Sequence, residues 1–160
     1  MHDPTESVIQ HQRNPLNPLY RRATSADIPA MSTIRLAVVE NTLSDPSRIT
    51  RDMYEDFLDV SGRGWVAEAG SEIVAFCYAD KTDASIWALF VRPGHEGNGY
   101  GQALLKLAVD WLFEIGHDRV TLTTGAGTRA DRFYAEQGWT RTPLGGTNVA
   151  YALTRSKALA

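Results

Sequence analysis

The sequence has one cysteine, no long apolar run, and no basic run longer than Arg21-Arg22. A single cysteine excludes an internal disulfide framework. Because Cys77 lies in the apolar stretch from Ile73 to Tyr78, it is expected to be a small buried side chain rather than a nucleophile. The absence of a membrane-length apolar stretch and of an N-terminal apolar leader predicts a cytoplasmic protein. With a net charge of −3, the chain offers no electrostatic footprint for nucleic acid.

Metal and nucleotide motifs are also missing. None of the four histidines pairs with another at metal-ligand spacing, so no metal site is expected. A dinucleotide fingerprint needs Gly-x-Gly-x-x-Gly, but its third glycine would fall on Gln102 or Leu104, depending on the frame. A Walker loop needs Gly-Lys-Ser/Thr, and Gly99 is followed by Tyr100-Gly101. Nucleoside triphosphates and dinucleotides are therefore not expected as ligands.

Length and composition indicate one folded unit. The chain has 160 residues, of which 43% are hydrophobic and 22% charged, which suits one domain with a sizeable core. Residues 1–18 are polar, contain three prolines and show no hydrophobic period. They are predicted to form a mobile N-terminal arm, and residues 19–160 a single domain.

Hydrophobic periodicity predicts the order of the elements in that domain. Seven strands are expected, at residues 19–23, 64–69, 72–80, 84–91, 119–124, 139–142 and 147–153. Four helices are expected, at about 28–38, 47–60, 102–115 and 128–137. The first two helices should cover one face of the sheet. In the third helix, an apolar stripe is predicted to be core, formed by Leu104, Ala108, Trp111 and Ile115.

Three alternating glycines, in Gly97-Asn98-Gly99-Tyr100-Gly101, lie between an apolar strand and an amphipathic helix. Glycine permits positive φ and lets a ligand approach the main chain, while a helix start leaves its first N–H groups without partners in the helix. Such a place binds anions, phosphates above all. An ordinary strand-to-helix turn is the alternative interpretation, and three glycines in alternation favour the anion site.

Two segments resemble motifs of the GNAT superfamily of N-acetyltransferases. The stretch from Val91 to Gly101 resembles the family's acyl-CoA loop, in which Val-x-Pro leads into Arg/Gln-x-x-Gly-x-Gly/Ala and a helix. The stretch from Arg129 to Trp139 resembles the family's last helix, with Tyr134 followed shortly by Gly138 and an aromatic residue. The two motifs occur in the family's order, and the resemblance covers most of the chain.

Two residues depart from the family pattern. Glu96 stands where the family usually has Arg or Gln, which puts an anion near the expected pyrophosphate. Gly127 stands where an Asn often precedes the tyrosine helix. These departures, together with a fourth strand that contains no acid, favour the alternative of a non-catalytic acyl-CoA-binding or sensing module. Tyr134 favours an enzyme.

The resemblance implies an α/β fold with a mixed, mostly antiparallel, centrally splayed sheet of about seven strands flanked by about four helices. It implies an acetyl-CoA-dependent N-acetyltransferase that acts by direct attack in a ternary complex, with acetyl-CoA as co-substrate and no metal. A small-molecule primary amine is the expected acceptor, and peptide or protein N-termini are the alternative. By analogy the resemblance also implies a homodimer.

The resemblance also implies which residues form the site. Backbone amides at the end of the fourth strand would polarise the thioester oxygen, and Tyr134 would be the acid for the leaving thiolate. The expected cofactor-binding residues are Phe90, Val91, Glu96, Gly97, Asn98, Gly99, Tyr100, Gly101, Gln102 and Tyr134.

The general base is less defined by the sequence. A carboxylate acting through water would serve, and Glu40 is the first candidate because it follows the first helix, where the family often lines its acceptor site. Asp80 and Asp83, which flank a turn, are the others. Trp65, Trp87 and Tyr151 could wall an apolar acceptor pocket, although aromatic residues on strands are more often core.

Overall fold

The computed structural model describes residues 17–39 and 51–158. The elements follow in the order β1 (Leu19–Arg22), η1 (Ser25–Asp27), α2 (Ile28–Val39), α3 (Arg51–Asp59), β2 (Gly62–Ala69), β3 (Glu72–Asp80), β4 (Ser85–Val91), α4 (Tyr100–Glu114), β5 (Arg119–Gly125), α5 (Arg129–Glu136), β6 (Thr140–Pro143), β7 (Asn148–Thr154) and α6 (Arg155–Ala158). All seven expected strands are present, with ends that shift by two residues at most. Most of the predicted N-terminal arm, and the first residues of the predicted second helix, lie outside the described residues.

Within the described residues, the seven strands form one sheet in the order β1-β2-β3-β4-β5-β7-β6. Neighbouring strands are antiparallel except for β4 and β5, which are parallel and share a single register pair, Ser85 with Thr121. In contrast, β5 pairs with β7 along its whole length, from Arg119 to Gly125. The expected mixed, mostly antiparallel and centrally splayed sheet is therefore confirmed.

A bulge in β4 lies next to the point where β4 and β5 separate. Tyr78 of β3 lies opposite Ala88, and the next residue, Ala79, lies opposite Ile86, so Trp87 is an extra residue in β4. An extra residue bends its strand and reverses which face the following side chains occupy. Ile86 accordingly packs on the face covered by α4, and Ala88 on the opposite face.

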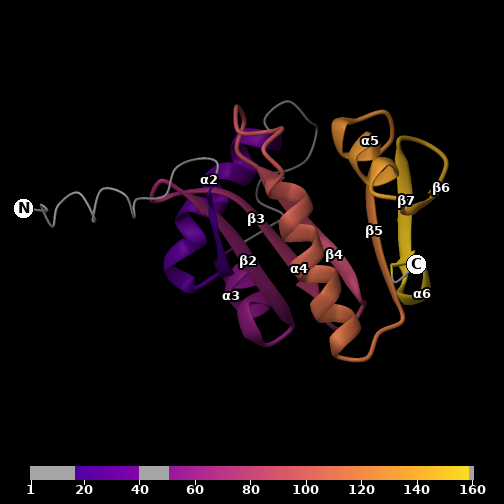
Figure 1. Cartoon of the computed structure of the whole chain (residues 1–160), viewed down its shortest axis with the longest axis horizontal. Helices are drawn as coiled ribbons and strands as arrows, with labels where there is room; N and C mark the ends of the chain where they lie inside the picture. Colours follow the sequence, from indigo (N-terminus) through magenta and orange to yellow (C-terminus); the bar gives the residue numbers. More distant parts are fainter. Residues whose placement is uncertain (1–16, 40–50, 159–160) are drawn as a thin grey trace, which may run out of the picture.

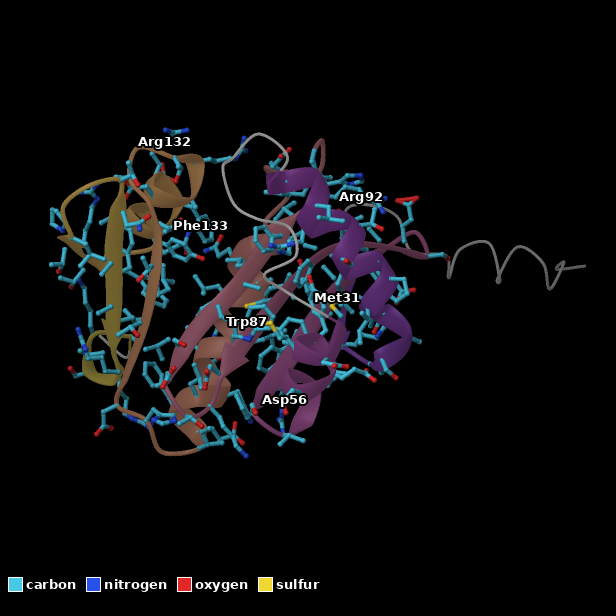
Figure 2. All side chains as sticks on the ribbon, turned by 180° about the vertical axis from the view of Figure 1, so that it is seen from behind. Met31, Asp56, Trp87, Arg92, Arg132 and Phe133 are labelled. Atoms are coloured by element: carbon cyan, nitrogen blue, oxygen red, sulfur yellow. The ribbon has the colours of Figure 1, made fainter. Side chains whose placement is uncertain are left out.

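The helices cover both faces of the sheet. Helix α4 packs on β2, β3 and β4 from one side, and α2 and α3 pack on the other, as Figures 1 and 2 show from opposite directions. The α2–α3 side buries Ile28, Met31 and Ile34 against Phe76 and Tyr78. The prediction that the first two helices cover one sheet face is confirmed. Helix α5 and strands β5, β7 and β6 lie together on the far side of the splay (Figure 1).

Helices α4 and α5 end in the same way. Beyond α4, Gly116 N donates to Phe113 O and His117 N to Leu112 O, at 3.0 and 3.1 Å. Beyond α5, Gly138 and Trp139 make the equivalent bonds. This pair of bonds is the Schellman motif, which satisfies carbonyls that a helix end leaves over. The predicted ends of these two helices, at about residues 115 and 137, are both confirmed.

Some sequence expectations were wrong in detail. Ile115 is 45% exposed, because it caps α4 beyond the last full turn and the buried stripe ends at Leu112. In α3, the helical spacing of the apolar residues Ile49, Met53 and Phe57 predicts that they form the buried side, but Met53 is 36% exposed and Tyr54 enters the core instead, with only 1% of its surface exposed. Ile49 and the side chain of Phe57 lie outside what the structure describes. Of the helices in the described part of the chain, none is long and apolar enough to span a membrane.

Candidate active site

The glycine loop between β4 and α4 has the backbone of an anion site. Gly97 and Gly99 both have φ of +83°, a conformation that L side chains rarely adopt. A Cβ placed on either would meet nothing within 4 Å, so backbone conformation rather than crowding requires glycine there. Gly99 is the N-cap of α4 and has no side chain to cap this helix start. The first-turn N–H groups of α4 therefore lie beside open space.

Gly101 differs from the other two glycines. It lies within α4, and a Cβ there would lie 3.7 Å from both Val91 and Phe133, an ordinary contact distance. Gly101 is therefore the point where the loop, the end of β4 and α5 come together. Tyr100 beside it has a buried phenol ring, so only its backbone belongs to the loop surface.

A cavity of about 830 Å³ runs from this loop to Tyr134. Its walls come from the end of β4, the glycine loop, one side of α5, and Ala37 and Val38 of α2. Of the predicted cofactor-binding residues, the cavity is lined by Phe90, Val91, Glu96, Gly97, Gly99, Tyr100, Gly101, Gln102 and Tyr134. Asn98 does not line it and instead donates from Nδ2 to His95 O at 3.0 Å.

Charged side chains of both signs line this large cavity. Arg129 and Arg132 of α5 supply two cations, which the sequence reasoning missed. Their spacing of three residues on the tyrosine helix was the available signal, because residues three apart share a helix face. Among the described residues that line the cavity, the acids are Glu96 and Glu136.

Glu96 is held by its own loop. Its Oε1 accepts a hydrogen bond from Gly94 N at 2.9 Å. Backbone N–H groups of Glu96 itself and of Gly94, with the charges of Arg129 and His95, hold the pKa of this carboxyl below its usual range. The carboxylate that departs from the family pattern thus stabilises the first turn of the loop.

A second cavity, of about 130 Å³, lies where β4 and β5 separate. Its lining is apolar apart from Thr123, Thr124 and Tyr134, and no described residue in it carries a charge. Trp87 lines this cavity, and Figure 2 shows it on the side of the sheet that α2 and α3 cover. Tyr134 lines both cavities and therefore stands at their junction.

Tyr134 is almost fully buried, with 5% of its surface exposed. Its ring packs against Phe133, Tyr151 and Trp139, with centroids 5.1, 5.6 and 5.7 Å away. No hydrogen bond from a described residue engages its hydroxyl. Burial, with a smaller effect from nearby Cys77, raises the pKa of Tyr134 well above its ordinary value. The phenol is therefore protonated at neutral pH and can only donate a proton.

Strand alternation assigns the backbone donors of β4. Arg92 N donates to Val74 O of β3 at 2.8 Å. Because successive N–H groups of a strand point to opposite neighbours, Phe90 N–H also points towards β3, and Val91 N–H points into the gap beside β5. Phe90 still lines both cavities through its side chain.

The structure does not gather the other candidates around Tyr134. Glu40 lies outside the described residues. Asp80 Oδ1 accepts hydrogen bonds from Thr82 N and Asp83 N, and neither aspartate lines either of these two cavities. Trp65 is core beside Trp111. Cys77 is fully buried, and burial raises the pKa of its thiol, as expected of a structural side chain.

Strand order, splay and a glycine loop at the start of α4 define the class of the fold, which is that of the N-acetyltransferases. The sequence profile of the acetyltransferase (GNAT) family matches residues 30–139, and the chain belongs to this family. The resemblance found in the sequence is thereby confirmed.

Comparisons with similar proteins support the family and the fold. An uncharacterized, ycf52-like N-acetyltransferase of Prochlorococcus marinus is 35% identical over 72 residues, which cover 44% of this chain and 39% of the relative. The chain thus spans about two fifths of the length of that curated relative. The PaiA N-acetyltransferase of Thermoplasma acidophilum, solved with coenzyme A, has a TM-score of 0.73 at 13% identity over 86% of this chain and 98% of its own. The ribosomal-protein-alanine N-acetyltransferase of Brucella melitensis has a TM-score of 0.69 at 21% identity over 85% and 99%.

Proposed function

We propose that this chain transfers an acetyl group from acetyl-CoA to a primary amine of a small molecule, by direct attack of the amine in a ternary complex. The proposal rests on one observation: the large cavity is continuous from the glycine loop to Tyr134, beside the splay. Residues 19–160 would form this one acetyltransferase domain. Pairing of two copies stays a prediction.

The residues around the large cavity fit coenzyme A. A volume of about 830 Å³ is in the range of cofactor sites. At one end, the start of α4 and its glycine loop offer N–H groups to a pyrophosphate, and Arg129 and Arg132 add positive charge. At the other end, Val91 N–H points into the gap, where it can donate to an amide or thioester oxygen. Gln102 adds a side-chain amide at the start of α4.

Acetyl transfer to an amine makes three demands. The amine must attack the thioester carbonyl carbon of acetyl-CoA, the charge that develops on the carbonyl oxygen must be stabilised, and the thiolate must leave. The amine nitrogen forms a bond to that carbon, and the carbon–sulfur bond breaks. Val91 N–H stabilises the negative charge that develops on the carbonyl oxygen, because a fixed donor in a dry site favours the transition state. A metal ion is not required, since a neutral amine is already a competent nucleophile for a thioester.

Tyr134 acts on the leaving sulfur. A phenol of ordinary pKa near 10 is a weaker acid than a thiol near 8.5, which makes full proton transfer uphill by roughly 2 kcal/mol. Burial raises the pKa of Tyr134 further above its ordinary value, so full proton transfer from the phenol stays uphill. Tyr134 therefore stabilises the thiolate first by a hydrogen bond, and the proton follows as the thiolate leaves. The proton that the attacking nitrogen loses as the amide forms then restores the phenol.

Glu40 is proposed as the general base that removes the proton of the attacking ammonium, through water. Its support is sequence position, since Ala37 and Val38 line the large cavity and Glu40 follows two residues later. No acid among the described residues lines the smaller cavity. If Glu40 is the base, Glu40→Gln lowers the turnover number more than it weakens acetyl-CoA binding.

The size of the smaller cavity supports a small acceptor. An engineered apolar cavity of about 150 Å³ holds benzene, and the space beside Tyr134 is of similar size, at about 130 Å³. A peptide N-terminus, the alternative acceptor, would need room for several residues. A non-catalytic acyl-CoA sensor remains the alternative from another class, and turnover separates it from the enzyme.

The proposal is tested first by ligand binding. Acetyl-CoA and CoA are expected to raise the Tm, while ATP and NAD leave it unchanged, because only a ligand that binds the native state stabilises it. A panel of small primary amines and short peptides is then screened by thiol release. If neither CoA species binds, the proposal fails; if both bind without thiol release, the sensor alternative holds.

Tyr134→Phe tests the acid. This change removes one hydroxyl and keeps the ring contacts, so acetyl-CoA affinity should change by less than about threefold. The turnover number should fall by about 10²-fold or more, as expected for loss of a positioned proton donor. Calorimetry and thiol release measure the two quantities. An unaltered turnover number would remove Tyr134 from the mechanism.

A further inference from the structure

Asp131 lies behind the proposed site and carries a dense set of hydrogen bonds. It belongs to the first turn of α5, is 6% exposed, and lines neither cavity. Its Oδ1 accepts from Arg141 Nε and its Oδ2 from Arg141 Nη2, each at 2.9 Å. Oδ2 also accepts from Gly127 N at 2.8 Å. At the same helix start, Asp131 N donates to Thr128 Oγ1 at 3.1 Å, so the Asp131 carboxylate reaches one residue before this N-cap.

Tyr151 completes this group. Its hydroxyl lies within hydrogen-bond distance of Asp131 Oδ1 and, at 2.7 Å, of Asp131 backbone O. A hydroxyl has one proton to donate, and a carboxylate is the stronger acceptor, so the proton goes to Oδ1. Hydrogen bonds from Arg141, then from Tyr151 and Gly127 N, hold the pKa of Asp131 far below its usual range. The carboxylate is therefore ionised at any pH at which an acetyltransferase assay is run.

The partners of Asp131 come from different elements. Arg141 belongs to β6, Tyr151 to β7, and Gly127 to the turn after β5. Helix α5 has eight residues, which is too short for a helix to be stable alone. A buried carboxylate bonded to three neighbours thus fixes the rotation of α5 against the sheet. Gly127, which stands where the family often has Asn, has no side chain of its own to do so.

The same bonds reach Tyr134. Tyr134 follows Asp131 by three residues, so both side chains lie on the face of α5 that meets the sheet. The ring of Tyr151, held by its hydroxyl, packs 5.6 Å from the ring of Tyr134. Asp131 therefore holds both the helix that carries Tyr134 and the ring of Tyr151, against which the ring of Tyr134 packs.

We propose that Asp131, Arg141 and Tyr151, here called the Asp131 cluster, are positioning residues that set the Tyr134 hydroxyl at the junction of the two cavities. The proposal rests on the proposed function, in which Tyr134 donates to the leaving sulfur. A displacement of about 1 Å at a reacting group can cost about 10²-fold in rate, which is the scale of effect that positioning can have.

The test combines Asp131→Asn with Tyr134→Phe. In the wild-type background, Asp131→Asn should lower kcat about 10-fold or more and change the acetyl-CoA Kd by less than about threefold. In the Tyr134→Phe background, the same change should alter kcat by less than about twofold, because the group that it positions is gone. Tyr151→Phe keeps the ring and removes only the hydroxyl, so it should give a smaller loss with the same background dependence.

Asp27→Asn is the matched control. Asp27 is also a buried carboxylate at a helix start, with a bidentate Arg21 at 2.8 and 2.9 Å and a backbone donor, Thr24 N, at 2.8 Å. Asp27 ends η1, next to β1 at one edge of the sheet, whereas α5 and Tyr134 pack on β5, beyond the splay. Both Asp→Asn variants should lower the Tm, and only Asp131→Asn should lower kcat per folded molecule.

The kcat values of these variants decide whether the Asp131 cluster positions Tyr134. Equal losses of kcat in both backgrounds, or no loss in a folded Asp131→Asn protein, overturn the positioning role. If Asp131→Asn does not fold, Tyr151→Phe in the two backgrounds decides by the same comparison. If Tyr134→Phe alone leaves kcat unchanged, the cluster has no group to position and the inference falls. Failure of the proposed function is distinct, since the wild-type protein would then show no acetyl transfer.

Discussion

At the scale of single residues, the glycine loop separates two reasons for having glycine. Gly97 and Gly99 are required by their positive φ, whereas Gly101 has an ordinary helical conformation and lies in ordinary contact with Val91 and Phe133. A side chain at Gly99 would force either a strained backbone or a different loop. A methyl group at Gly101 would meet only side chains at normal distance. The two positions should therefore respond in opposite ways to the same change.

Gly99→Ala should lower the Tm and weaken acetyl-CoA binding about 10-fold, because a non-glycine residue in the left-handed region costs roughly 1–2 kcal/mol. Gly101→Ala should leave the Tm unchanged or raise it, because Ala is the better helix former by about 1 kcal/mol. Calorimetry with acetyl-CoA and a thermal melt give both quantities. Equal affinities for the two variants would show that the loop does not hold the ligand by its main chain.

At the scale of elements, α6 contacts the end of α4 through hydrogen bonds from Arg155. The guanidinium of Arg155, the first residue of α6, donates to Phe113 O and, at 2.9 Å, to His117 O. It also lies over the Phe113 ring, 5.2 Å from the centroid. Carbonyls at a helix C-terminus are partly negative, so a cation there is favourable. This contact joins residues more than 35 apart in sequence and connects α4 to the strands beyond the splay.

Arg155→Ala should lower the free energy of unfolding by about 1 kcal/mol, a typical value for a partly exposed hydrogen bond to a charged group. Acetyl-CoA affinity should not change, because Arg155 lines neither cavity. Urea unfolding followed by circular dichroism measures the first effect. Arg155→Lys is the control: it keeps the charge and one donor and should recover part of the loss. A urea midpoint equal to that of the wild type for Arg155→Ala would show that the contacts of Arg155 with the end of α4 do not contribute to stability.

The elements themselves were largely predictable, since strand alternation, helical stripes and glycine stops each act within a few residues of sequence. The errors have identifiable causes. Met53 and Tyr54 are neighbours on one short helix, and only packing against Tyr78 and Phe76 decides which of them is buried. The Trp87 bulge depends on the register of β3, which no local pattern encodes.

The candidate site was predictable where it depends on backbone and failed where it depends on distant partners. The loop and Tyr134 were found because their motifs are contiguous. The Asp131 cluster joins residues 10 and 20 positions apart on three elements, so spacing alone could not reveal it. Of the three aromatic residues predicted to wall an acceptor pocket, Trp87 lines a cavity, whereas Trp65 and Tyr151 are buried in the core.

At the scale of the whole molecule, two buried carboxylate–arginine groups brace opposite ends of the sheet. Asp27 joins η1 to β1 through Arg21, and Asp131 joins α5 to β6 through Arg141. Hydrogen bonds from these arginines, above all, hold the pKa values of both carboxyls below the ordinary range. A carboxyl whose pKa is lowered by folding stabilises the native state above its unfolded pKa, and this stability is lost as the pH falls through the folded pKa.

The Tm should therefore be insensitive to these groups from about pH 5 to pH 8, and should fall below about pH 4, where the unfolded chain begins to take up protons that the native state does not. Asn cannot titrate, so a protein carrying both Asp27→Asn and Asp131→Asn should show a lower Tm at neutral pH and a shallower decline in acid. Scanning calorimetry between pH 2 and pH 8 measures both. An acid slope equal to that of the wild type would assign acid unfolding to other carboxyls.

The single register pair between β4 and β5 also divides the molecule in a way that follows the chain. Of the described residues, those before Gly116 build one leaf of the sheet with its covering helices, and those after it build the other, so the polypeptide passes between the leaves once. The glycine loop belongs to the first leaf and Tyr134 to the second. A break in the chain at the turn after α4 would put the glycine loop on one fragment and Tyr134 on the other. Acetyl transfer by a mixture of the two fragments would then measure their reassembly into one sheet.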